Sequence, residues 1–182
     1  GVSPEIYRKI ITIVKRCESA AVLDVDGEAL RAGITARPDI IKPNIHELSE
    51  LVGRELKGID EITAAVREIN RQGVRIVLVS MGARGILMVS EEKELLAVPP
   101  TVDVASTIGA GDSSVAGFVS GLVQNKKLEQ CLAYAAAAGT ATTLHQGTAL
   151  AQKEDFDRLV PHVQVTALSS VIEKEKEKAN AM

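Results

Sequence analysis

Residues 106–113, Ser-Thr-Ile-Gly-Ala-Gly-Asp-Ser, place two glycines and an alanine directly before a carboxylate at the start of a helical run. At a helix N-terminus the first backbone N–H groups have no partner within the helix, and the macrodipole favours negative charge. The N–H groups of Gly109, Ala110 and Gly111 would therefore be unpaired and able to hold a phosphoryl group. Asp112 would then lie within reach of a hydroxyl that attacks this group. Such a layout suits phosphoryl transfer, which depends on charge neutralisation and an aligned nucleophile.

The same turn is open to three alternative interpretations. It could be an ordinary turn in which Asp112 caps the next helix. The dinucleotide-binding pattern G-x-G-x-x-G is a poorer match, because Ser114 takes the third glycine position and no acidic residue follows where a ribose would be read. A P-loop is excluded, since the segment has no Gly-Lys-Ser/Thr ending. The turn alone leaves the anion site and the ordinary turn open.

The surrounding chain alternates predicted helices with short apolar strands. Apolar residues at helical spacing predict helices at about 3–17, 44–52, 60–73, 113–123, 128–144 and 153–160. Short apolar runs predict buried strands at 21–25, 39–42 and 76–79, and residues 86–89 and 95–98 predict a β-hairpin. Gly117 and Gly121 would permit a neighbouring helix to approach closely. The pattern predicts an α/β fold with a mostly parallel sheet, covered by helices on both faces.

In such a sheet, ligands bind outside the carboxyl ends of the strands. Asn44, Ser80 and the 109–112 turn are expected to meet there. Asp24 and Asp26 follow the first strand, so they would either approach a substrate at this edge or belong to a solvated loop. Both interpretations of these two aspartates remain open.

Composition excludes several classes of function. The 182 residues are 46% hydrophobic and 25% charged, which is typical of one globular domain. A net charge of −3, two Phe, two Tyr and no Trp provide neither a basic surface nor aromatic stacking for nucleic acid. Cys17 and Cys131 are too few for a disulfide framework and lack metal-ligand spacing. Without a long apolar run or a signal peptide, we expect a cytoplasmic protein with no membrane partner.

Four segments together resemble the PfkB, or ribokinase-like, family of carbohydrate kinases. Residues 106–119, S-T-I-G-A-G-D-S-S-V-A-G-F-V, resemble that family's C-terminal signature throughout. Lys-Pro-Asn-Ile-His-Glu at 42–47, Ser-Met-Gly-Ala-Arg-Gly at 80–85 and His-Gln-Gly-Thr at 145–148 occur in the order that the family has. A chance turn at 109–112 does not predict the other three segments, so the ordinary turn becomes the poorer interpretation.

The resemblance implies a ribokinase-like α/β fold over residues 1–165, corresponding to somewhat more than the C-terminal half of such a kinase. From this resemblance, we expect the chain to lack the strands, lid sheet and sugar-gripping residues that the family carries before this part. We therefore expect the chain on its own to be inactive. Residues 166–182 carry alternating charges and are expected to form a frayed tail.

Position by position, the resemblance implies catalytic roles. Asp112 corresponds to the base that takes the proton from the acceptor hydroxyl, and the 109–111 turn to the anion hole for the γ-phosphate of ATP. Asn44 and Glu47 match the family's N-x-x-E pattern, which organises Mg²⁺ through bound water. The same two residues also read as a helix N-cap with a capping-box glutamate, and both roles can hold at once.

The resemblance also implies where ATP is held. Lys42 is similar to a phosphate-facing lysine of the family's phosphofructokinase branch, with a solvated lysine as the alternative. His145 falls where the family packs against adenine and ribose, although a plain surface histidine would read the same. The other nucleotide positions are Asn44, Ser80, Gly82, Gly85, Thr140, Ala141, Leu144 and Gly147.

Some relatives bind a monovalent cation through backbone carbonyls between two of these loops. The corresponding positions here are Ser106, Ile108, Thr142 and Gly147. Ser106 stands where ribokinases commonly carry Asp. Because of this departure, the resemblance implies K⁺ less directly than it implies ATP and Mg²⁺.

Three features are most similar to the phosphofructokinase and tagatose-6-phosphate kinase branch of the family. They are the Ser-Thr form of the signature, Lys-Pro-Asn at 42–44 and the Pro99-Pro100 pair. The implied activity is ATP-dependent phosphoryl transfer to a phosphorylated ketohexose: fructose 1-phosphate, fructose 6-phosphate or tagatose 6-phosphate. The full-length enzyme is expected to be a homodimer. Two alternatives stay open: a PfkB-type kinase of a nucleoside or vitamin, and a non-catalytic nucleotide-binding fragment.

Overall fold

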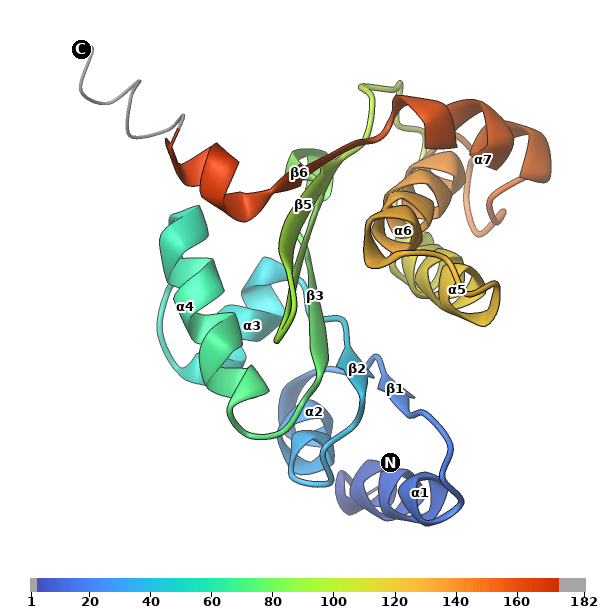
Figure 1. Cartoon of the computed structure of the whole chain (residues 1–182). Helices are drawn as coiled ribbons and strands as arrows, with labels where there is room; N and C mark the ends of the chain where they lie inside the picture. The colour runs from blue at the N-terminus through green and yellow to red at the C-terminus, as the bar shows by residue number, and fades with distance from the viewer. Residues whose placement is uncertain (1–2, 174–182) are drawn as a thin grey trace. The chain divides into compact units, whose positions relative to one another are not determined.

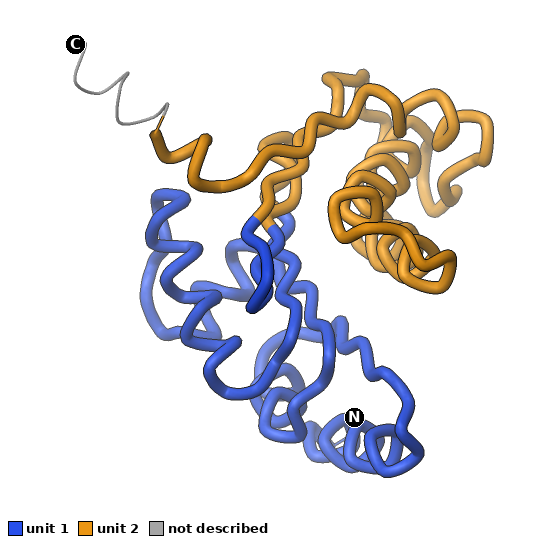
Figure 2. The backbone as a smooth tube through the Cα atoms, viewed as in Figure 1, with its two compact units in different colours: residues 1–80, 88–94 blue, residues 81–87, 95–182 orange. Residues whose placement is uncertain are grey.

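A computed structural model describes residues 3–173 of the chain. Its six strands form one sheet in the order β1-β2-β3-β4-β5-β6 (Figure 1). The chain divides into two compact units, coloured separately in Figure 2: residues 1–80 with 88–94, and residues 81–87 with 95–182. The sheet and its helices confirm the predicted α/β class.

The first unit alternates helices with parallel strands. Its elements are α1 (Glu5–Arg16), β1 (Val22–Leu23), α2 (Gly27–Ile34), β2 (Ile40–Ile41), α3 (Ile45–Val52), α4 (Ile59–Asn70) and β3 (Ile76–Ser80). Ile40 of β2 lies opposite Val22 of β1 and Ile76 of β3, and both pairings are parallel. The predicted parallel strands are therefore confirmed, although β1 and β2 are only two residues long.

Two helices of this unit differ from the sequence prediction. Helix α2 has no predicted counterpart, because its two glycines disfavour a helix. Gly33 is needed for packing, since a Cβ there would lie 2.5 Å from Leu23 Cδ2 of β1. Helix α4 begins at Ile59 with Gly58 as its N-cap and ends at Asn70, so it ends three residues before the predicted end at residue 73.

Strand β3 is buried on both faces. Val77, Leu78 and Val79 are each at most 1% exposed, although successive side chains of a strand point to opposite faces. Leu48 of α3 and Val66 of α4 are fully buried as well. Continuous burial of this kind is typical of a parallel strand covered by helices on both faces, as the sequence predicts.

The hairpin strands β4 (Ile86–Ser90) and β5 (Glu94–Val98) have residues in both units. Ser90 N–H donates to the Lys93 carbonyl at 2.9 Å in the connecting turn. The two strands are neighbours in the sheet. The predicted β-hairpin is therefore confirmed.

The remaining elements of the second unit are η1 (Gly82–Arg84), α5 (Ala110–Val123), α6 (Leu128–Thr143), α7 (Lys153–Leu159), η2 (Val160–His162) and β6 (Gln164–Ala167). Two glycines bring α5 against α6. A Cβ on Gly117 would lie 2.4 Å from the Tyr134 carbonyl oxygen, and one on Gly121 would lie 2.9 Å from Cys131 Cα. The close helix approach predicted from these glycines is confirmed.

Strand β6 has no counterpart in the sequence prediction. It pairs antiparallel with β5, with Leu95 opposite Ala167 and Val98 opposite Gln164, and residues 168–173 continue as a helix. Residues 166–173 thus have regular structure where a frayed tail is expected, because pairing with β5 supplies hydrogen bonds that the sequence does not reveal. Residues 174–182 of that expected tail lie outside the described residues. Within the described part of the chain, no helix is long and apolar enough to cross a membrane.

Candidate functional site

Asn44 and Glu47 form a complete capping box at the start of α3. Asn44 Oδ1 accepts from the Glu47 N–H at 2.9 Å, and Glu47 Oε2 accepts from the Asn44 N–H at 2.9 Å. Asn44 Nδ2 also donates to Glu47 Oε1 at 2.6 Å. The capping role proposed from the sequence is confirmed. These bonds fix the glutamate carboxylate in one orientation, while each oxygen keeps a lone pair for a further donor.

The first unit brings Asn44 next to Ser80. Asn44, which follows the end of β2, forms a parallel bridge with Ser80, the last residue of β3, and Ser80 N–H donates to the Pro43 carbonyl at 3.0 Å. Both are partly exposed. The ends of two parallel strands therefore present neighbouring polar side chains at one edge of the sheet, as the strand pattern predicts.

Lys42 is buried at the same edge. Its side chain is 7% exposed, and its Nζ lies 3.3 Å from Oδ1 of Asp24, which follows β1. The alternative of a solvated lysine is therefore wrong. The sequence left the roles of Asp24 and Asp26 open. In the structure, Asp24 pairs with Lys42. Asp26 is exposed at the N-cap position of α2 and makes no side-chain capping bond.

The turn before α5 is the predicted anion site. Gly109 is left-handed, with φ of 76°, and stands at the N-cap position. Ala110 N–H donates to the Thr107 carbonyl at 3.3 Å, so this N–H is not unpaired as the sequence suggests. Gly111 and Asp112 follow in the first helical turn, where no intrahelical carbonyl is available. The Asp112 side chain is exposed and has no hydrogen bond or ion pair among the described residues.

A buried hydroxyl pair anchors this turn to α6. Thr142 is fully buried and donates through Oγ1 to Ser113 Oγ at 2.6 Å. Ser114 Oγ donates to the Ala110 carbonyl at 2.8 Å, and a Cβ on Gly139 would lie 2.2 Å from that Oγ. These contacts with α6 therefore fix the position of the first turn of α5.

The two loops expected at a monovalent cation site are in contact. Ser106 Oγ donates to the Gly147 carbonyl at 3.0 Å and accepts from the Ile108 N–H at 3.2 Å. The Ala105 N–H donates to the Thr143 carbonyl at 2.8 Å. The predicted proximity of these loops is confirmed.

The turn after β3 contains two left-handed glycines. The Gly85 N–H donates to the Gly82 carbonyl at 2.9 Å, and a Cβ on Gly85 would lie 1.9 Å from the Ala97 carbonyl oxygen. Only glycine fits at position 85. Gly82 has φ of 60° and no atom within 4 Å of a Cβ, so its backbone lies open to solvent or ligand.

The remaining nucleotide candidates lie at the end of α6. Thr140 and Leu144 are partly buried, and Leu144 packs against a core of Ala137, Ala141 and Leu159. His145 Nε2 lies 2.8 Å from Oδ2 of Asp155 in α7. The sequence weighs His145 as a ligand or a surface residue and misses this contact, for which it offers no signal.

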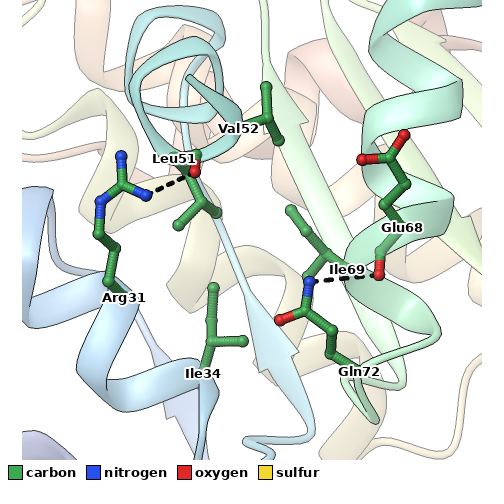
Figure 3. Close-up of a pocket in the computed structure, with 7 residues that line it drawn as sticks. All are labelled: Arg31, Ile34, Leu51, Val52, Glu68, Ile69 and Gln72. Carbon is green, nitrogen blue, oxygen red and sulfur yellow. Dashed lines mark hydrogen bonds between the residues drawn. The ribbon is translucent and has the colours of Figure 1, made fainter. Parts of the chain in front are cut away.

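Two grooves lie in the first unit. One, of about 290 Å³, runs between α2, α3 and α4, and Arg31 donates there to the Leu51 carbonyl (Figure 3). None of the predicted site residues lines it. The other, of about 350 Å³, is lined by residues of α2 and α3 that include Glu47. Mg²⁺ keeps several of its waters in proteins, so residues that hold it need open space of this kind beside them.

The structure brings together Asn44, Glu47 and Ser80 in one unit and the Asp112 turn with Thr142 in the other. That Asn44 and Asp112 face one ligand stays a prediction. Within residues 3–173, no three His, Cys, Asp or Glu side chains gather as a metal cluster. A Mg²⁺ held mainly through water and phosphate oxygens needs no such cluster.

Known proteins resemble most of this chain. Residues 1–155 match the family described as pfkB family carbohydrate kinase. The chain is 34% identical to 1-phosphofructokinase of Vibrio cholerae, covering 92% of this chain and 53% of that protein. It is 37% identical to ATP-dependent 6-phosphofructokinase isozyme 2 of Escherichia coli, covering 90% and 53%. The crystal structure of phosphofructokinase-2 from Escherichia coli in complex with potassium superposes with a TM-score of 0.84 at 37% identity, covering 88% and 53%. The chain thus spans about half the length of the curated relatives it matches.

Proposed function

Because the chain belongs to the pfkB family of carbohydrate kinases and has the ribokinase-like α/β fold, we propose that it is the nucleotide-handling part of an ATP-dependent sugar-phosphate kinase. The proposed acceptor is a hydroxyl of a phosphorylated ketohexose, either fructose 1-phosphate, fructose 6-phosphate or tagatose 6-phosphate. The names of the relatives, 1-phosphofructokinase and 6-phosphofructokinase, support this class of acceptor.

The observation that carries the proposal is the first turn of α5. Left-handed Gly109 leads into a helix in which the Gly111 and Asp112 N–H groups have no intrahelical acceptor, and Asp112 is exposed in the same turn. Donors that are fixed before the reaction stabilise developing negative charge without reorganising. In the proposed mechanism the γ-phosphoryl group binds these donors, and Asp112 accepts the proton of the attacking hydroxyl.

Lys42, Asn44 and Glu47 are proposed to act on the phosphates and on Mg²⁺. The ammonium of Lys42 lies 3.3 Å from one carboxylate oxygen and has three N–H donors, so it would keep a donor for a phosphate oxygen. Bound Mg²⁺ would neutralise charge on the phosphates. Asn44 and Glu47 would hold its water ligands, because their capping bonds fix the carboxylate and leave lone pairs for those waters.

K⁺ is proposed as a second cation, held at Ser106, Ile108, Thr142 and Gly147. The contacts between these loops and the potassium-bound relative of known structure support it. Ser106 replaces the usual Asp, so the site would depend on carbonyl oxygens. We expect the kinase activity to rise when NaCl is replaced by KCl at constant ionic strength. Equal activity in both salts would contradict the K⁺ site.

The experiment that tests the proposed function is a substrate panel. The full-length kinase that carries this chain is assayed with ATP and Mg²⁺ against the three ketohexose phosphates, a nucleoside and a vitamin acceptor. We expect the highest kcat/KM for one of the ketohexose phosphates. A nucleoside or vitamin as best acceptor would favour the alternative kinase, and ATP binding without any transfer would favour a non-catalytic role. Light scattering of the same sample tests the expected homodimer.

A further inference from the structure

His145 belongs to the segment 142–145, which is hydrogen-bonded to residues around the α5 turn. The His145 N–H donates to the Thr142 carbonyl at 3.2 Å, and the Thr142 hydroxyl bonds Ser113 in the first turn of α5. The Ala105 and Ser106 N–H groups both donate to the Thr143 carbonyl. The position of the His145 main chain relative to the proposed phosphate site is therefore fixed within one unit.

The His145 ring is fixed as well, by a carboxylate from α7. Its Nε2 lies 2.8 Å from Asp155 Oδ2, and the two side chains are 29% and 20% exposed. The other oxygen of Asp155 accepts from Arg158 Nη2 at 2.6 Å. The hydrogen bonds of Arg158 and then of His145 lower the pKa of Asp155, so the group is a carboxylate at neutral pH.

This contact decides which ring nitrogen carries the proton. A carboxylate offers only acceptors, so His145 Nε2 must donate to it. In the neutral imidazole the other nitrogen, Nδ1, is then an acceptor. No hydrogen bond to Nδ1 occurs among the described residues.

We propose that Asp155 is a positioning residue that fixes His145 with Nδ1 as the acceptor for an N–H or O–H donor of the nucleoside half of ATP. The inference rests on the proposed function, which places ATP at α5. Two groups of ATP have the required chemistry, a ribose hydroxyl and the 6-amino group of adenine. A site that accepts a specific hydrogen bond discriminates against analogues that lack the donor.

The test compares KM for ATP and kcat of the full-length kinase with Asp155→Ala, His145→Ala and the double substitution. We expect each single change to raise KM for ATP about threefold to tenfold, the loss of roughly one hydrogen bond, with kcat nearly unchanged. The double variant should be no worse than His145→Ala, because Asp155 acts through His145. Arg158→Ala is the matched control, since it removes the other partner of Asp155 and should leave KM within about twofold.

Nucleotide analogues identify the donor. In the wild-type enzyme, 2′-deoxy-ATP or 3′-deoxy-ATP should bind more weakly if a ribose hydroxyl donates, and inosine triphosphate if the 6-amino group donates. That penalty should disappear in Asp155→Ala. If Asp155→Ala lowers only the melting temperature, or if its KM effect adds fully to that of His145→Ala, the positioning role is wrong. This result would leave the proposed kinase function intact, because that function stands or falls on the substrate panel.

Discussion

Among single residues, Asp39 ties three segments of the first unit together. Its carboxylate accepts from Lys15 Nζ at 2.8 Å and from the Ala21 N–H at 2.9 Å, and Arg75 Nη1 lies 3.8 Å away. Burial alone would raise the pKa of Asp39, but the hydrogen bonds from Lys15 and Ala21 and the charges of Lys15 and Arg75 outweigh it, so the pKa is lowered. The ionised carboxylate therefore stabilises the fold.

The lowered pKa of Asp39 predicts a pH dependence of stability. The contribution is fully present above the unfolded-state pKa of about 3.9 and is lost as pH falls through the lower folded-state pKa. Asp39→Asn should reduce the free energy of unfolding by about 1–3 kcal/mol at pH 7, and the difference from wild type should shrink below pH 4. Urea unfolding at several pH values measures this. The matched control is Asp103→Asn at an exposed position; if Asp39→Asn ran parallel to wild type at all pH values, the assigned contribution would be wrong.

At the scale of elements, the residues at the start of α3 form a capping box and are also proposed to act on Mg²⁺. This capping box is complete, and Glu47 is also the proposed holder of Mg²⁺-bound water. Glutamine is also found at this capping-box position, so Glu47→Gln should keep the free energy of unfolding within about 1 kcal/mol of wild type. Removal of the charge should raise the Mg²⁺ concentration for half-maximal activity about tenfold, the loss of one charge-assisted bond.

Glu50→Gln is the control for Glu47→Gln. It makes the same change three residues later on α3, where the side chain is 54% exposed and pairs only with His46 among the described contacts. We expect the Mg²⁺ requirement of this variant to equal that of wild type. An equal shift in both variants would show a general charge effect, and no shift in Glu47→Gln would remove this residue from the magnesium site.

The packing of α5 on α6 gives a second prediction at this scale. Gly117→Ala introduces a Cβ 2.4 Å from the Tyr134 carbonyl oxygen. Although alanine favours helix over glycine, the clash should lower the free energy of unfolding by about 1–3 kcal/mol. Ser120→Ala, at an exposed position of the same helix, should change it by less than about 0.5 kcal/mol. A neutral or stabilising Gly117→Ala in urea unfolding would contradict the packing.

For the whole molecule, the sequence predicts the helices and turns that depend on neighbouring residues in the chain. Apolar spacing indicates the helices of both units, and glycines indicate the turn at residues 109–112 and the contact of α5 with α6. It does not predict α2 or β6, because α2 depends on packing of Gly33 against Leu23 and β6 on pairing with β5. Tertiary context decides both.

Some contacts of the candidate site are predictable from the sequence, and others depend on the fold. The capping box of Asn44 follows from residue types three apart in the sequence, so it is predictable. The burial of Lys42 against Asp24 and the contact of His145 with Asp155 depend on segments that the fold brings together. Residue types at these four positions carry no sign of such pairing.

The central claim is that the α5 turn binds the transferred phosphoryl group while Asp112 takes the proton of the acceptor. Its most direct test is kcat of full-length Asp112→Asn beside Asp103→Asn, with nucleotide binding measured on the same samples. We predict that Asp112→Asn binds ATP normally but loses about a hundredfold to ten-thousandfold in kcat, whereas Asp103→Asn behaves as wild type. Near-normal turnover of Asp112→Asn would contradict the claim.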